Sequence, residues 1–193
     1  MSEKLIERAR HAFASYKPQT ANLNSLRPAA VLLLLYQKDG EPHVVLIERA
    51  QNVENHKGQI AFPGGSREEI DGDLRATAIR ETYEELGVQP EHMEIIGQLD
   101  DLVTGTNFRI TPFVGVVGAP APYPFLPAPA EVAAVLEIPL ARLRDEASFE
   151  IEMREWQGRT VPVGAFNWGG YHIWGATARI LRQFLDILDG DGE

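Results

Sequence analysis

The stretch FPGGSREEIDGDLRATAIRETYEELGV, residues 62–88, carries the features that decide the fold. Its second half has a helical pattern over residues 74–86, and Gly87 is placed as the C-terminal stop. The last two turns of this predicted helix contain Glu81, Glu84 and Glu85. Because the C-terminal end of a helix carries partial negative charge and favours Lys or Arg, these carboxylates stand at an unfavourable end.

The three glutamates also repel one another. Each residue of an α-helix advances by about 100°, so Glu84 and Glu85 flank Glu81 on one face, within about 60° of it. At roughly 6 Å and an effective dielectric of about 20, each like-charged pair costs about 3 kcal/mol. A hard divalent cation such as Mg²⁺ would remove this cost, because it takes clustered carboxylate oxygens and fills its other positions with water and substrate phosphates. The alternative is a glutamate-rich helix that is merely solvated.

The acidity of the chain is concentrated around this helix. The 193 residues have a formal net charge of -10, and residues 65–101 hold eleven Asp or Glu against three Arg, a local charge of -8. Such a surface disfavours nucleic acid, and it repels phosphate unless a cation lies on it. We therefore expect no nucleic-acid partner.

The bulk composition predicts a globular, cytoplasmic protein. Hydrophobic residues make up 44% of the chain, which is ordinary for a packed core, and the absence of cysteine means no disulfide framework. No apolar run approaches the length of a membrane span, so we expect no membrane partner. The composition leaves the oligomeric state open.

The pattern outside this stretch predicts strands with a few helices. We expect one domain over residues 1–193, with an N-terminal helix near 1–16 and a C-terminal helix near 176–188. The expected strands cover residues 27–37, 43–50, 59–62, 93–99, 109–117 and 131–139, followed by a short helix at 139–146 and a hairpin at 160–175. This order indicates a mixed α/β or α+β fold.

Two glycines precede the acidic helix. Gly64 and Gly65 follow the short strand expected at residues 59–62, and neither has a side chain. The backbone can therefore approach a metal ion or a phosphate closely at this point.

The acidic helix resembles a known family motif. Residues 80–88 read RETYEELGV, which is similar to the Nudix box of pyrophosphohydrolases that act on nucleoside diphosphate derivatives, with core Arg-Glu-apolar-x-Glu-Glu-x-Gly-apolar. Thr82 stands at an apolar position of this core. The spacing from the glycines to Arg80 is longer than in the general box, and three residues compete for its upstream glutamate position: Glu69, Asp71 and Asp73.

The segment before the helix resembles the coenzyme A pyrophosphatase subfamily. Residues 45–65 read VLIERAQNVENHKGQIAFPGG, and they match the subfamily pattern at Leu46, Arg49, Ala50, Gly58, Phe62, Pro63, Gly64 and Gly65. Glu54 departs from the pattern, which has Arg there. The resemblance implies a Nudix fold, with a mixed β-sheet sandwiched between helices. It also implies Mg²⁺- or Mn²⁺-dependent hydrolysis of coenzyme A, and of its oxidised or acyl derivatives, to 3′,5′-ADP and 4′-phosphopantetheine.

The resemblance also implies roles for individual residues. Glu81 and Glu85 would bind the metal with Glu84 as a third ligand, and Arg80 would orient these carboxylates. Glu131, at the end of a Pro-rich loop, is the first choice for the general base, and Glu84 and Arg80 are the other catalytic candidates. The candidates for substrate binding are Arg49, Lys57, Arg67 and the backbone of Gly64 or Gly65.

Three other functions compete with this one. A Nudix hydrolase of ADP-ribose or a dinucleotide is favoured by Glu54 alone. A non-catalytic Nudix binding domain would be expected to lose box glutamates, and this chain keeps all three. An acidic protein-interaction domain leaves the Phe-Pro-Gly-Gly segment unexplained.

Overall fold

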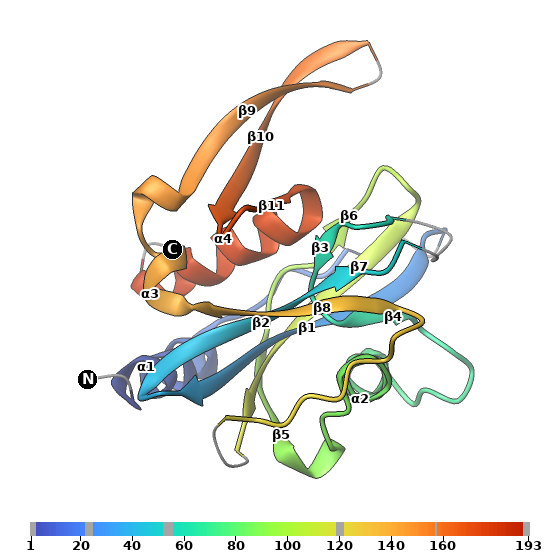
Figure 1. Cartoon of the computed structure of the whole chain (residues 1–193). Helices are drawn as coiled ribbons and strands as arrows, with labels where there is room; N and C mark the ends of the chain where they lie inside the picture. Colours follow the sequence, from blue (N-terminus) through green and yellow to red (C-terminus); the bar gives the residue numbers. More distant parts are fainter. Residues whose placement is uncertain (1–2, 22–24, 52–55, 119–121, 157, 191–193) are drawn as a thin grey trace.

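The structure is a computed structural model, and it describes residues 3–21, 25–51, 56–118, 122–156 and 158–190 (Figure 1). Its main sheet is mixed, with the path β3-β2-β1-β7-β5. Strands β4, β6 and β8 pair with β1, β7 and β2 respectively. The pairing of β1 with β7 is parallel, and the others are antiparallel. The bounds are β1 Arg27–Lys38, β2 Glu41–Arg49, β3 Ile60–Ala61, β4 Gly64–Ser66, β5 Met93–Gln98, β6 Leu102–Val103, β7 Phe108–Val117 and β8 Val132–Pro139.

Helices cover both faces of this sheet. Leu33 and Leu35 of β1 pack in one apolar cluster with α1 (Glu3–Ser15) and α4 (Gly175–Asp189), whereas Leu32 and Leu34 pack in a second cluster with α2 (Leu74–Leu86). The run of leucines in β1 is therefore unbroken because each face of the strand has its own core. This is a mixed α+β architecture with a mixed sheet between helices, as expected from the sequence.

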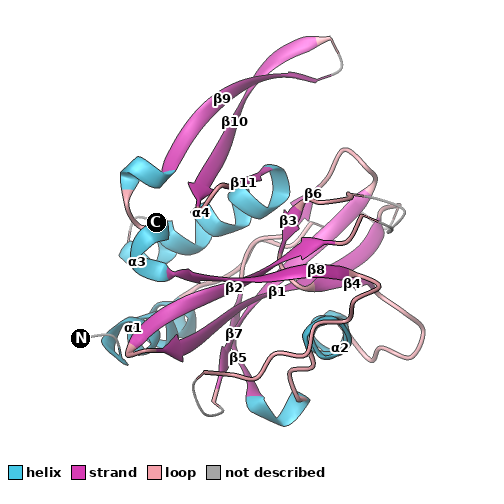
Figure 2. Cartoon of the chain, viewed as in Figure 1, coloured by secondary structure: helices cyan, strands magenta, loops and turns pink. Residues whose placement is uncertain are grey.

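A second antiparallel sheet lies beyond α4, in the order β11-β10-β9 (Figure 2). Its strands are β9 Phe149–Trp156, β10 Arg159–Trp168 and β11 Tyr171–Trp174. The hairpin expected at residues 160–175 corresponds to β10 and β11. Strand β9 was not expected, although Phe149, Ile151 and Met153 alternate with charged residues as in a strand exposed on one face.

The local signals around the acidic helix are confirmed. Helix α2 begins and ends at the predicted residues, and Gly87 has the left-handed φ of 69° that a C-terminal stop requires.

The short helix expected at 139–146 is the single turn α3 (Leu140–Leu143), and two 3₁₀ turns lie at Pro90–His92 and Glu146–Ser148. Gly64 and Gly65 follow the short strand β3, as expected, and they also begin strand β4. Among the described residues, no helix is long and apolar enough to cross a membrane.

Candidate active site

Helix α2 is held at both ends. The Asp73 side chain accepts a hydrogen bond from the Ala76 N–H at 2.8 Å, and the Gly87 N–H donates to the Tyr83 carbonyl at 2.8 Å. Ala78 and Leu86 are buried on the sheet side. The polar side of the last two turns is thereby fixed relative to β4.

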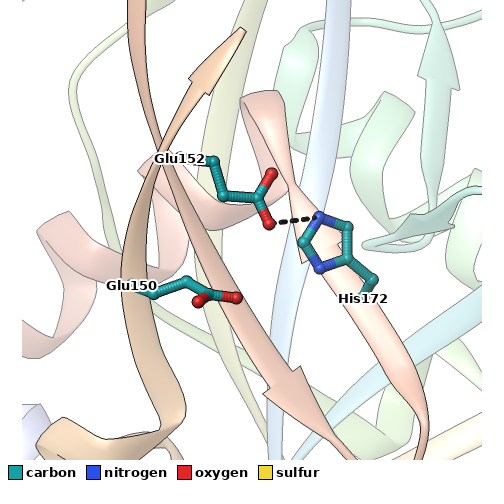
Figure 3. Close-up of side chains that lie close together, drawn as sticks. All are labelled: Glu150, Glu152 and His172. Atoms are coloured by element: carbon teal, nitrogen blue, oxygen red, sulfur yellow. Dashed lines mark ion pairs between the residues drawn. The ribbon is translucent and has the colours of Figure 1, made fainter.

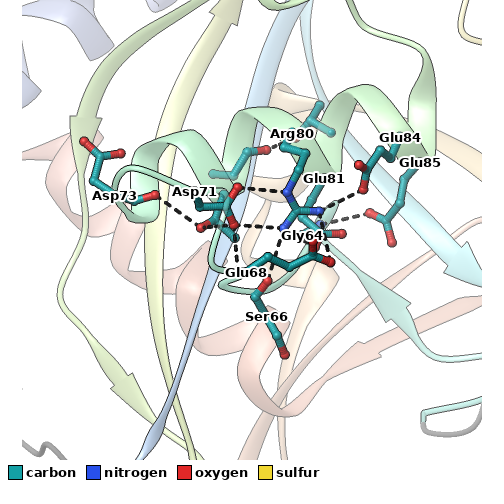
Figure 4. A network of polar contacts seen from close by, with 12 residues as sticks. Gly64, Ser66, Glu68, Asp71, Asp73, Arg80, Glu81, Glu84 and Glu85 are labelled. Carbon is teal, nitrogen blue, oxygen red and sulfur yellow. Dashed lines mark hydrogen bonds and ion pairs between the residues drawn. The ribbon is translucent and has the colours of Figure 1, made fainter.

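Arg80 is the centre of a polar network on this side (Figure 4). Its Nε and Nη2 donate to the two carboxylate oxygens of Asp71 at 2.9 and 3.0 Å, and its Nη2 also donates to the Ser66 carbonyl at 3.2 Å. Nη2 lies 2.9 Å from Glu81 Oε1, and Nη1 lies 2.8 Å from Glu84 Oε2. Arg80 therefore contacts two of the box glutamates and offsets part of their repulsion.

Asp71 is the acidic residue that pairs with Arg80. It is 5% exposed, and its carboxylate also accepts from the Thr77 hydroxyl and the Glu68 N–H, each at 2.9 Å. The hydrogen bond from Arg80 is the main reason that the pKa of Asp71 lies well below its ordinary value of 3.8, and the bonds from Glu68 and Thr77 lower it further. Asp73 instead caps α2, and Glu69 is exposed. The sequence left Glu69, Asp71 and Asp73 as alternatives for the upstream acidic position of the box. Of the three, Asp71 is the buried one that pairs with Arg80.

Glu85 is the most deeply buried of the box glutamates. It is 1% exposed, and its Oε2 accepts a hydrogen bond from the Gly64 N–H at 2.9 Å. Burial raises the pKa of Glu85 to about 8, against the opposing effects of the Gly64 N–H and the Arg49 charge, and the charges of Glu81 and Glu131 raise it further. Burial is likewise the largest cause of the raised pKa of Glu81, and the charges of Glu84 and Glu131 add to it.

The two glycines of β4 make room for this arrangement. A Cβ on Gly65 would lie 2.5 Å from Glu81 Oε1, and one on Gly64, whose φ is 150°, would lie 2.3 Å from the Ala30 carbonyl oxygen. Gly65 therefore lets the Glu81 carboxylate rest against the strand, and Gly64 lets β4 approach β1.

Glu131 lies at the same site although it is distant in sequence. It is exposed just before β8, and its carbonyl accepts a hydrogen bond from the Ala50 N–H at 2.8 Å. Burial is the main cause of the raised pKa values of Glu81 and Glu85, and the negative charge of Glu131 adds to both.

The predicted cationic residues occupy different surroundings. Arg49 Nη1 lies 3.7 Å from Glu85 Oε1, and Arg49 Nε is buried with no hydrogen-bond partner among the described residues. The Nη2 of Arg67 donates to the carbonyls of Asp71 and Gly72 at 3.1 Å each, so this residue holds the loop before α2. Lys57 is exposed, and Glu54 lies outside the described residues.

The donor atoms at this site suit a hard divalent cation. Glu81, Glu84 and Glu85 offer only carboxylate oxygens, which are the ligands that Mg²⁺ and Mn²⁺ prefer. The raised pKa values of Glu81 and Glu85 show that their negative charges are undercompensated by the protein itself. A cation at this point would correct that imbalance, so the residues present fit a metal ion.

A second cluster of possible ligands lies away from α2, on β9 and β11 (Figure 3). In the described part of the chain, one set of three such side chains has its ligand atoms within 4.8 Å of one another: Glu150, Glu152 and His172. Arg154 Nη2 lies 2.8 Å from Glu152 Oε2 and 2.9 Å from His172 Nε2, so a cation of the protein already occupies the space between them. We interpret this cluster, which the sequence did not predict, as an ion-pair network.

A comparison with known families matches residues 26–163 to the NUDIX domain, a range that contains the acidic helix, β4 and Glu131. The chain belongs to the Nudix family. Members of this family generally need a divalent metal ion, in agreement with the carboxylate donors on α2.

Relatives of this Nudix chain match it over nearly its whole length. A protein of Cronobacter sakazakii (strain ATCC BAA-894), described as the uncharacterized Nudix hydrolase NudL, is 37% identical over 183 residues, which is 92% of each chain. A NudL of Enterobacter sp. (strain 638), described in the same words, is 38% identical over 81% of this chain and 80% of its own. The MutT/nudix family protein from Enterococcus faecalis has a similar fold, with a TM-score of 0.54 at 18% identity over 96% of this chain and 70% of that one.

Proposed function

We propose that this Nudix hydrolase cleaves the diphosphate of coenzyme A, or of its oxidised and acyl derivatives, to 3′,5′-ADP and 4′-phosphopantetheine in the cytoplasm. The observation that supports the proposal is the position of Arg49, whose guanidinium lies 3.7 Å from the buried Glu85 beside β4. Arg49 belongs to the segment that resembles coenzyme A pyrophosphatases, and Glu85 belongs to the Nudix box. The two motifs therefore meet at one site.

Glu81, Glu84 and Glu85 would hold Mg²⁺ or Mn²⁺, and the backbone of Gly64 or Gly65 lies beside them. Such an ion, when bound, stabilises the negative charge that develops on the diphosphate oxygens. In the structure Glu81 and Glu84 both contact Arg80, and Glu85 accepts from Gly64. Arg80 and the Gly64 N–H would act as positioning groups that keep the three carboxylates aimed at the site.

Glu131 would act as the general base. It is exposed, and its charge reaches both Glu81 and Glu85, so it lies beside the proposed metal-binding carboxylates. As water attacks phosphorus, Glu131 would accept its proton while the bridging P–O bond breaks toward the leaving phosphate.

Arg49 would bind the substrate. Its buried Nε has no partner among the described residues, and a buried donor without a partner is favourable only when a ligand supplies an acceptor. A diphosphate oxygen is such an acceptor, and a guanidinium binds phosphate oxygens well. Lys57 and Arg67 are further candidates, and Arg67 would act mainly through the loop that it holds.

Product analysis tests the proposal. The protein is incubated with coenzyme A and, separately, with ADP-ribose, with and without Mn²⁺. We expect metal-dependent release of 3′,5′-ADP from coenzyme A while ADP-ribose stays intact. The Glu85→Gln variant should lose this activity, whereas Glu69→Gln, which changes an exposed glutamate outside the network, should keep it.

A second candidate function rests on one observation. Glu54 replaces the Arg of the coenzyme A pattern and removes a cation that could meet a phosphate. Hydrolysis of ADP-ribose or a dinucleotide by the same carboxylates would fit this difference. Cleavage of ADP-ribose alone in the product assay would select this function and reject coenzyme A. Absence of turnover of either substrate would contradict hydrolysis of both coenzyme A and ADP-ribose.

A further inference from the structure

The three-stranded sheet forms an arm that extends beyond the main body. In Figures 1 and 2, β9 and β10 rise past α4, with β9 on the outer side. Strand β9 ends the order β11-β10-β9, so its second edge has no partner strand among the described residues. An unpaired edge presents a row of backbone N–H and C=O groups that can pair with another strand.

The register of β9 with β10 shows which backbone groups point to this edge. Met153 lies opposite Pro162, which has no N–H. Bonded and non-bonded pairs alternate in an antiparallel ladder, so Met153 and Pro162 form a non-bonded pair. The backbone groups of Met153, and by alternation those of Ile151 and Glu155, therefore face outward.

The side chains of β9 alternate between a mainly apolar face and a charged face. Ile151 is 61% exposed and Met153 is 63% exposed, and they share the mainly apolar face with Glu155. Glu152 and Arg154 lie on the other face, where they are ion-paired at 2.8 Å. An unpaired edge that bears exposed apolar side chains can pair with another strand.

Two contacts hold the arm in place. Trp156 lies against Gly105 in the loop after β6, since a Cβ on Gly105 would come within 2.5 Å of the indole ring. The guanidinium of Arg154 lies 4.2 Å from the ring centre of Trp174. The outer edge is therefore already formed, and pairing would cost little ordering.

We propose that β9 pairs with β9 of a second copy of this chain, antiparallel and about a two-fold axis at Met153. In this register Met153 meets its own counterpart on the apolar face. Glu152 of each copy lies opposite Arg154 of the other on the charged face, so the interface has two complementary cross-strand pairs. The two arms together would make one continuous sheet of two three-stranded halves.

The charge pattern selects this register over its neighbours. A two-fold axis at Glu152 would place Glu152 of one copy opposite Glu152 of the other. A two-fold axis at Arg154 would likewise place the two copies of Arg154 opposite each other. Like charges directly opposite destabilise a sheet, whereas opposite charges stabilise it. Of these three registers, the one centred on Met153 avoids a like-charged pair at the axis.

Disulfide cross-linking tests the register, because the chain has no cysteine of its own. Opposed residues have Cα atoms about 4.5 to 5.5 Å apart, within the range that a disulfide spans. We expect the Met153→Cys variant to form a covalent dimer under mild oxidant at least about tenfold faster than Glu155→Cys, through its higher effective concentration. Two copies of residue 155 would lie about 13 Å apart along the strands. Equal rates for the two variants, or faster linking of Glu152→Cys, would overturn the proposal.

Light scattering on the unmodified protein supplies an independent test. We expect the full chain to be a dimer at micromolar concentration and Met153→Lys to be a monomer, because two like charges would meet at the axis. Met153 is 63% exposed, so this variant should keep its circular dichroism spectrum and its hydrolase activity. A wild-type monomer, or a Met153→Lys dimer, would contradict the proposal.

Discussion

At the scale of single residues, the candidate site depends on how each carboxylate is compensated. Asp71 and Glu85 are both nearly fully buried, yet their pKa values move in opposite directions. Asp71 meets a guanidinium and two further donors, whereas Glu85 receives one N–H and a distant Arg49. The first carboxylate is therefore structural, and the second is suited to bind a cation.

Glu85 should make the stability of the metal-free protein depend on pH. Its pKa rises from 4.5 in the unfolded chain to about 8 in the folded one, so the folded state holds a proton that the unfolded state has released. Its contribution is fully present below pH 4.5 and is lost as pH rises through about 8. Denaturant unfolding in chelator should show a free energy of unfolding that falls over this range in wild type and falls less in Glu85→Gln. Parallel pH profiles for the two proteins would contradict this assignment.

Asp71→Asn should lower the free energy of unfolding by about 2 to 3 kcal/mol, because it breaks a buried ion pair and leaves Arg80 undercompensated. The remaining contacts of Arg80 with Glu81 and Glu84 limit the loss. Since the pKa of Asp71 is lowered from 3.8, the wild-type advantage should be present above that pH and shrink as pH falls below it. Urea unfolding at pH 7 and pH 3 measures both effects. Glu69→Gln, in the same loop, should change little at either pH.

Glu131→Gln should lower kcat by about 10²- to 10⁴-fold, the usual contribution of a general base, while KM changes little. The amide cannot accept a proton, so the acidic limb of the pH–rate profile should also change. Steady-state kinetics on the cleaved substrate, with Mn²⁺ at saturation, measures both. A kcat within twofold of wild type would remove Glu131 from the mechanism.

At the scale of elements, β4 and α2 form one unit in which glycine serves two purposes. Gly64 approaches the backbone of β1, and Gly65 approaches the Glu81 side chain. The backbone of β1 cannot move aside as easily as the Glu81 carboxylate. A substitution by alanine should therefore have different effects at Gly64 and at Gly65.

Gly64→Ala should destabilise the fold by about 2 to 4 kcal/mol, because the added Cβ would meet the Ala30 carbonyl. Gly65→Ala should cost less stability but reduce activity at least about tenfold, because it displaces the Glu81 carboxylate. Thermal unfolding and product assays on both variants separate the two effects. Gly72→Ala is the matched control, since nothing lies within 4 Å of a Cβ there.

The elements also show which signals in the sequence were sufficient. The bounds of α2 follow from a helical period and a glycine stop, which are local, and the structure confirms them. Strand β9 has a local signal as well, because Phe149, Ile151 and Met153 alternate with Glu150, Glu152 and Arg154, but it was not predicted. The structure shows it paired with β10.

At the scale of the whole molecule, the proposed metal site should make the stability of the fold depend on bound metal. An ion that binds the folded chain alone stabilises it by mass action. Saturating Mg²⁺ or Mn²⁺ should raise the Tm of the wild type by several degrees, since about 2.7 kcal/mol is gained at 100 times Kd. The Glu81→Gln/Glu85→Gln double variant should show no such shift in Tm. The reference Tm of each protein is measured in chelator without added metal. An equal shift in both proteins would place the ion elsewhere.

The sequence by itself determined the acidic helix, its limits and its membership of a Nudix box, because these depend on residues within a few positions of one another. Only the tertiary structure decided that Asp71 pairs with Arg80, that Arg49 and Glu131 lie at Glu85, and that β9 forms an outer edge. The physical reason is the separation of the interacting residues along the sequence. Helical period and capping act between residues a few positions apart. Contacts between a loop, a strand and a helix join distant residues, and they depend on how both faces of the sheet are covered.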